Sequence, residues 1–152
     1  MSASNAIAHP HRFSAFPASR RIAAGVIGGL AGGLLFGILM AMMGMLPMVA
    51  SMVGSDSAWV GFGVHLVISV LIGLGLTVPF AHLVLTSYAR GALAGLAYGV
   101  LWWILGPLLI MPSMLGMPLF MLDLTALMSL MGHLIYGVVL ALVAVRVLKG
   151  RA

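Results

Sequence analysis

Two histidines carry the clearest candidate chemistry in this sequence. His65 and His133 each fall inside a long apolar stretch, among small or polar residues spaced four apart. An imidazole is costly to expose to lipid, so both rings are expected to point into a helix bundle. As a pair they could bind haem or a metal ion, or share a proton. Alternatively, each ring hydrogen-bonds to a nearby serine, threonine or carbonyl group, and the sequence leaves both interpretations open.

The methionines add a second candidate chemistry. Apart from Met1, they occur only within residues 40–52 and 111–131. Thioether sulfur is a soft ligand that suits Cu(I), and neighbours three or four residues apart share a helix face. Methionine is equally a flexible apolar filler. Haem and copper are therefore the possible cofactors, neither firmly implied, and the candidate metal ligands are His65, His133, Met48, Met52, Met114 and Met117.

The sequence shows no set of residues suited to catalysis. Without cysteine it has no disulfide, thiolate or cysteine-held iron–sulfur chemistry. Asp56 and Asp123 are the only acids, and neither lies within a long apolar helix pattern. The glycine-rich stretches lack the Lys-Ser/Thr ending of a phosphate-binding loop. We therefore expect a protein that is not an enzyme.

The elements that carry these residues are predicted to be transmembrane helices. The chain is 63% hydrophobic and 6% charged, whereas soluble domains carry roughly 25% charged residues. A spanning helix needs about 20 apolar residues. The sequence therefore predicts an all-α, polytopic membrane protein with four helices, over residues 22–46, 58–80, 90–111 and 121–146.

Four prolines mark the expected helix ends and one expected kink. Pro47 and Pro112 are expected to end the first and third helices, and Pro79 the second, because proline lacks the amide hydrogen that continues a helix. Pro107 lies inside the third helix and is expected to kink it.

The charges predict the topology. Basic residues precede the first helix, follow the fourth, or lie between the second and third, while both acids fall in the two other loops. Because basic residues collect in cytoplasmic loops, both termini are expected in the cytoplasm. The predicted domains are a disordered N-terminal tail (1–20), a transmembrane domain (21–147) and a C-terminal tail (148–152). The basic residues form no continuous patch interleaved with aromatic residues, so no nucleic-acid partner is expected.

The chain also repeats itself. Repeat one (22–80) and repeat two (90–146) share the order of glycine, aspartate and histidine, with two helices each. Copies with an even number of helices have the same orientation and are related by an axis along the membrane normal. Glycines four residues apart let helix backbones approach closely, as in a glycine zipper. The expected packing glycines are Gly29, Gly33, Gly37, Gly91, Gly95 and Gly99.

Short motifs resemble a known group of proteins. Gly99-Val100-Leu101-Trp102-Trp103, then Met111-Pro112, then His133-Leu134-Ile135-Tyr136-Gly137 resemble small YagU-like bacterial inner-membrane proteins, whose function is unassigned. The resemblance covers about residues 22–146. It implies four helices in a bacterial inner membrane, and no catalytic residue is carried over.

Three functions are compatible with these patterns. The first is a non-enzymatic structural or interaction module whose partners are the lipid bilayer and itself or another membrane protein. The second is a haem- or copper-binding protein that uses His65, His133 and nearby methionines. The third is a small transporter, which the absence of charged groups within the helices makes less favourable.

Overall fold

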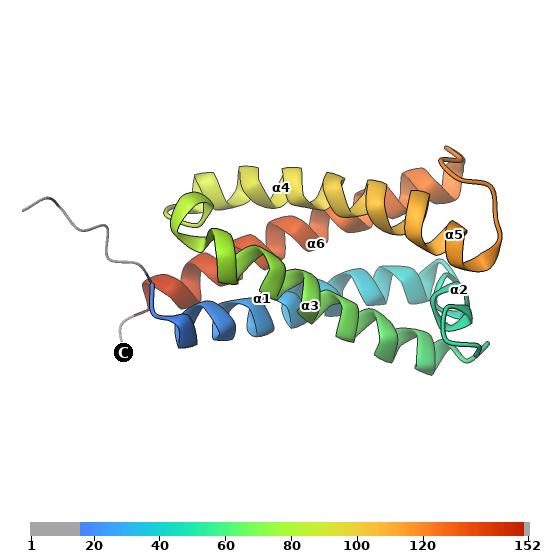
Figure 1. The fold of residues 1–152 in the computed structure, drawn as a ribbon, viewed down its shortest axis with the longest axis horizontal. Helices are drawn as coiled ribbons and strands as arrows, with labels where there is room; N and C mark the ends of the chain where they lie inside the picture. Colours follow the sequence, from blue (N-terminus) through green and yellow to red (C-terminus); the bar gives the residue numbers. More distant parts are fainter. Residues whose placement is uncertain (1–15, 151–152) are drawn as a thin grey trace, which may run out of the picture.

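A computed structural model describes residues 16–150, and all of its regular structure is helical (Figure 1). The helices are α1 (Ala18–Met42), α2 (Leu46–Ser51), α3 (Ala58–Val84), α4 (Tyr88–Leu105), a π-helical turn (Gly106–Ile110), α5 (Met111–Leu115) and α6 (Leu124–Lys149).

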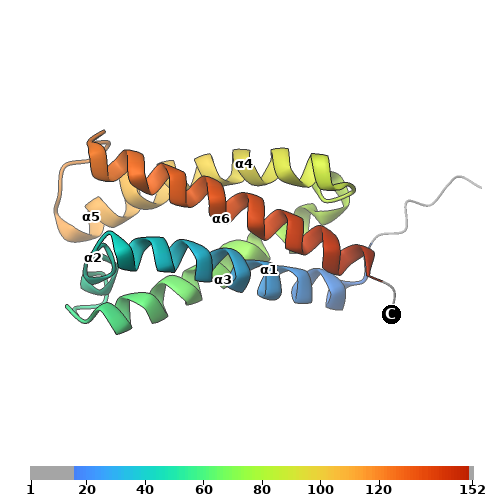
Figure 2. The same ribbon diagram turned by 180° about the vertical axis from the view of Figure 1, so that it is seen from behind.

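The four long helices form a bundle with α1 and α6 at its centre. Helix α1 packs along both α3 and α6, and α4 packs along α6, whereas α3 and α4 contact each other only marginally. Figure 2 shows α1 and α6 running next to each other on the face opposite α3. The described chain ends and the α3–α4 loop lie at one end, here called the terminal end. Helices α2 and α5 lie at the other, the α2–α5 end.

The prediction of four apolar helices is confirmed. Each is long and apolar enough to cross a membrane, as in a multi-pass membrane protein, and the spans are Ala18–Met42, Ala58–Val84, Tyr88–Leu115 and Leu124–Lys149. Large apolar side chains cover the outside of the bundle, among them Leu71 and Leu93, which are 61% and 68% exposed. Such a surface is stable against lipid chains and unstable against water.

The helices extend beyond their predicted bounds at the terminal end. Helix α1 begins at Ala18, so Ala18–Arg20 belong to it and not to a tail. Residues 1–15 and 151–152 of the two predicted tails lie outside the described residues. Helix α3 continues to Val84, with Pro79 inside it, and α6 continues to Lys149.

Two prolines start short helices where the sequence predicted helix ends. Helix α1 already stops at Met42, before Gly44 (φ 67°), and Pro47 lies in the first turn of α2. Pro112 lies in the first turn of α5, which continues to Leu115. Proline is tolerated there because a first-turn amide has no partner within its helix. Pro112 has no amide hydrogen to donate to the Leu108 carbonyl, four residues earlier. That carbonyl accepts a hydrogen bond from the Phe120 amide at 2.9 Å.

Pro107 changes the third long helix by widening one turn. The Met111 amide bonds to the Gly106 carbonyl, five residues back, instead of the usual four. Such π turns arise within α-helices at sites where the regular ladder is interrupted, and they are frequent at functional sites. This turn lies beside the cavity described below.

Glycines form the closest contacts between helices. A Cβ atom at Gly33 would fall 2.7 Å from the Ser69 Cβ across the α1–α3 contact. A Cβ atom at Gly95 would fall 2.7 Å from the Gly137 carbonyl carbon across the α4–α6 contact. Cβ atoms do not approach other atoms this closely, so the backbones lie where only glycine fits.

The largest fully buried side chains lie in the terminal half of the bundle, namely Thr77, Leu85, Leu140, Val145 and Leu148. Helices α3 and α4 diverge toward the α2–α5 end, where the candidate site lies.

Candidate ligand-binding cavity

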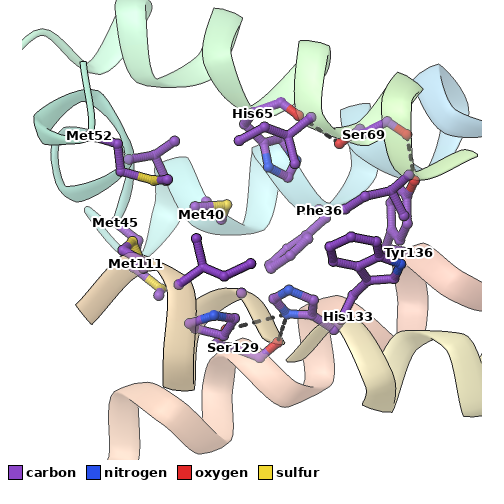
Figure 3. A pocket seen from close by; sticks show the side chains of 17 residues that line it. Phe36, Met40, Met45, Met52, His65, Ser69, Met111, Ser129, His133 and Tyr136 are labelled. Atoms are coloured by element: carbon purple, nitrogen blue, oxygen red, sulfur yellow. Dashed lines mark hydrogen bonds between the residues drawn. The ribbon is translucent and has the colours of Figure 1, made fainter. Parts of the chain in front are cut away.

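A cavity of about 270 Å³ lies in the α2–α5 half of the bundle, with both candidate histidines in its lining (Figure 3). Its size is close to the lower end of small-molecule sites. Helices α1 and α6 form its floor, α3 and α4 with the π turn form its side walls, and α2 and α5 close its end. Besides the histidines its lining includes Phe36, Met40, Met45, Met52, Ile68, Ser69, Ile72, Trp102, Gly106, Ile110, Met111, Ser129 and Tyr136.

The cavity is partly open, and its walls indicate where. Helices α3 and α4 contact each other only marginally and diverge toward the α2–α5 end (Figure 1). Ile68 and Ile72 line the cavity from α3, and Ile110, which is 41% exposed, lines it from the π turn. The Tyr98 hydroxyl of α4 donates to the Ile72 carbonyl oxygen at 2.8 Å, so the two helices are joined at that level. Toward the α2–α5 end, the apolar side chains of Ile68 and Ile110 edge the space between them.

His65 reaches the cavity from α3 and is fixed against α1. Its Nε2 lies 3.0 Å from the carbonyl oxygen of Gly33, and its side chain is buried. The adjacent Cδ2 edge faces Gly37, where an added Cβ would lie at 3.2 Å. The glycine face of α1 thus makes room for this imidazole, and the ring's opposite edge carries Nδ1.

His133 reaches the cavity from α6 and is fixed by its own helix. Its Nδ1 lies 2.8 Å from the carbonyl oxygen of Ser129 and 3.4 Å from the Ser129 hydroxyl. Its Nε2 faces Gly106 at the start of the π turn, where an added Cβ would lie 3.8 Å away. The widened turn therefore borders the free nitrogen of this ring.

The hydrogen bonds to carbonyl oxygens determine which nitrogens carry protons. A carbonyl oxygen only accepts, so His65 Nε2 and His133 Nδ1 are the donors. In neutral imidazoles, His65 Nδ1 and His133 Nε2 then carry lone pairs. No residue within 16–150 donates a hydrogen bond to either of them. Each ring can therefore accept a hydrogen bond from a ligand or coordinate a metal ion.

Phe36 contacts both imidazoles. Its ring centroid lies 5.2 Å from that of His65 and 4.8 Å from that of His133, edge to face in both cases. Figure 3 shows the phenyl ring between the two histidines. A metal ion or haem iron that bound both rings at once would require Phe36 to move aside. No group of three or more His, Asp or Glu side chains suited to a metal ion occurs among the described residues.

The structure brings some of the predicted methionines to the cavity and leaves others away from it. Met52 lines the cavity, whereas Met48 and Met117 line a smaller neighbouring cavity of about 140 Å³. Met114 lines neither and is 56% exposed. Three further methionines, Met40, Met45 and Met111, line the main cavity and were not predicted as ligands. Helix spacing could not reveal them because α1, α2 and α5 meet only in the tertiary structure.

Two hydrogen bonds at Ser69 lie beside the cavity, one joining α6 to α3 and one within α3. The Tyr136 hydroxyl donates to the Ser69 carbonyl oxygen at 2.6 Å, and the Ser69 hydroxyl donates to the His65 carbonyl oxygen at 2.7 Å (Figure 3). Tyr136 and Phe36 were not predicted as site residues. The available signal was that Phe36 continues the row of Gly28 and Gly32, which faces α6, where Gly132 leaves space for its ring.

The chain matches no protein family, and no curated protein or solved structure is significantly similar to it.

Proposed function

We propose that this chain is a non-enzymatic membrane module that holds a small apolar molecule in the cavity between its helix pairs. The observation that carries the proposal is a partly open, largely apolar cavity in which His65 and His133 each present a free lone pair. Apolar walls with a few convergent polar groups are typical of ligand sites. The lining offers two imidazoles as hydrogen-bonding groups, with no carboxylate or lysine beside them.

The proposed location is a bacterial inner membrane, with both termini in the cytoplasm. The distribution of charge supports this orientation: Arg20, Arg90 and Lys149 lie at the terminal end, and Asp56 and Asp123 lie at the α2–α5 end. In this orientation the cavity occupies the outer half of the membrane. The resemblance to small YagU-like proteins supports the same location.

The proposed architecture is a parallel duplication. The α1–α3 and α4–α6 contacts are similar in kind, since Gly33 meets Ser69 in the first and Gly95 meets Gly137 in the second. Gly37 meets His65 in the first, and Gly99 meets the His133 backbone in the second. In the proposed duplication each repeat supplies one histidine, and the cavity lies between the two repeats.

Copper or haem is the second candidate ligand. The observation that favours a soft metal is that the same cavity holds two free imidazole nitrogens and four methionines. The position of Phe36 favours one imidazole per metal ion over a shared centre. Metal content after purification in detergent, together with the visible spectrum, tests this alternative.

The test of the proposed function is photolabelling of the protein in lipid nanodiscs. We use an uncharged phenyl diazirine, which inserts into whatever surrounds it, and map the adducts by mass spectrometry. We expect saturable labelling at Met40 and His133 in the cavity, and non-saturable labelling at lipid-facing Leu71.

Gly106 offers a matched pair of variants for this experiment. An added Cβ there meets only His133 Nε2, at 3.8 Å, so Gly106→Ala should fold and retain cavity labelling. Gly106→Leu should project into the cavity and remove the labelling there, with Leu71 labelling unchanged. Labelling confined to lipid-facing residues in the unaltered protein would show that no apolar molecule enters.

A further inference from the structure

We propose that the ligand of this cavity is a lipid-soluble hydroquinone, that is, a para-dihydroxy aromatic ring with an apolar tail. This inference rests on the proposed function and specifies its ligand class. In the complex, one hydroxyl donates to His65 Nδ1 and the other to His133 Nε2.

The direction of the hydrogen bonds selects a donor ligand. Both imidazoles already donate to backbone carbonyl oxygens, at 3.0 Å from Gly33 and 2.8 Å from Ser129. Their remaining nitrogens can only accept while the rings are neutral. At these two nitrogens a carbonyl oxygen would meet a lone pair, and the unpaired donor of the lining, the buried Trp102 Nε1, could serve one carbonyl oxygen but neither imidazole. A ligand with hydroxyl groups would satisfy both nitrogens.

The arrangement of the acceptors selects two donors at opposite ends of one group. Phe36 lies between the two imidazoles, and His65 is fixed by a carbonyl of α1 whereas His133 is fixed by a carbonyl of α6, so the two acceptors belong to opposite walls of the cavity. Para hydroxyls leave an aromatic ring in opposite directions. A ring lying alongside Phe36 can therefore place one hydroxyl toward α3 and the other toward α6.

The walls suit an aromatic head group. Phe36, Trp102 and Tyr136 contribute aromatic rings, and Met40 and Met111 contribute polarisable sulfur. Aromatic rings pack favourably against both. The volume of about 270 Å³ accommodates a head group. In the proposed complex the tail leaves between α3 and α4 on the α2–α5 side of the Tyr98–Ile72 hydrogen bond, against Ile68 and Ile110, and continues into the lipid.

The test is competition against the diazirine in nanodiscs by two probes of nearly equal size. The first is decylhydroquinone, kept reduced with dithionite, and the second is its dimethyl ether, which has the same ring and tail but no donor. We expect decylhydroquinone to suppress labelling of Met40 and His133 at a concentration at least about tenfold lower than the ether does. We expect His65→Phe and His133→Phe to remove this preference. His82→Phe, on the exposed part of α3, should keep it.

Each other outcome overturns the inference in a distinguishable way. Equal competition by the two probes would show that the cavity binds apolar molecules without hydrogen-bonding to their hydroxyl groups. The hydroquinone assignment would then be wrong, and the proposed function would stand. Cavity labelling that neither probe displaces would exclude this ligand class. A complete lack of cavity labelling would contradict both the inference and the proposed function. The comparison in the unaltered protein decides the matter even where a histidine variant does not fold.

Discussion

At the residue scale, His65 and His133 face one cavity from α3 and α6, with the Phe36 ring between them. The cost of exposing imidazole to lipid predicts that His65 and His133 point inward, and both line the cavity. Their separation by Phe36 follows from the crossing of α1 with α3 and α6, which no local pattern encodes. The protonated nitrogen of each ring likewise depends on which carbonyl group its helix neighbours present.

Tyr136 provides a residue-scale prediction. Tyr136→Phe removes the hydroxyl that donates to the Ser69 carbonyl oxygen from inside the bundle. Hydrogen bonds between membrane helices contribute about 0.6–2 kcal/mol, so we expect the free energy of unfolding in mixed micelles to fall by that amount. Tyr88→Phe is the control, because Tyr88 is exposed at the start of α4. An equal effect of both substitutions would show that the Tyr136 bond contributes nothing specific.

At the element scale, the helices were predictable and several of their ends were not. Apolar length identifies four long helices because lipid requires satisfied backbone groups. Proline identifies helix ends less well, because the residue fits a first turn as easily as it ends a helix. Pro47 and Pro112 therefore begin α2 and α5, and Pro107 produces a π turn in place of a simple kink.

Gly95 provides an element-scale prediction. An alanine Cβ at this position would fall 2.7 Å from the Gly137 carbonyl carbon, and the neighbouring backbone cannot yield without separating α4 from α6. We expect Gly95→Ala to lower the free energy of unfolding by about 1–3 kcal/mol, as overpacking does.

Gly63 is the matched control for Gly95. It lies in the second turn of α3, is exposed, and has no atom within 4 Å of an added Cβ. Gly63→Ala should leave the free energy of unfolding unchanged or raise it slightly, because alanine has the higher helix propensity. If the two alanine variants unfold alike, the α4–α6 contact is looser than described.

At the scale of the whole molecule, the orientation in the membrane is a prediction from charge. We expect reporter fusions at Ala152 and at Asp123 to report opposite sides of the membrane, with the Ala152 fusion in the cytoplasm. Alkaline phosphatase, active outside, and a fluorescent protein, active inside, give complementary readings. Fusions that report the same side would contradict the arrangement of four crossings.

The gap between α3 and α4 is a whole-molecule feature that the sequence could not supply. Each helix of the pair packs on its own partner, α3 on α1 and α4 on α6, and both partners pack on each other. The two outer helices are therefore held apart by the inner pair. The resulting cavity brings together residues from α1, α2, α3, α4, the π turn, α5 and α6.

Reversible closure of this gap tests whether an apolar ligand enters between α3 and α4. The sequence has no cysteine, so Ile68→Cys on α3 and Ile110→Cys in the π turn provide two sites for a disulfide-containing bismaleimide. We expect bridging to remove saturable diazirine labelling at Met40 and His133, and reduction of the bridge to restore it. Capping both cysteines with N-ethylmaleimide should leave the labelling in place. Undiminished cavity labelling in the bridged protein would contradict entry of an apolar ligand between α3 and α4.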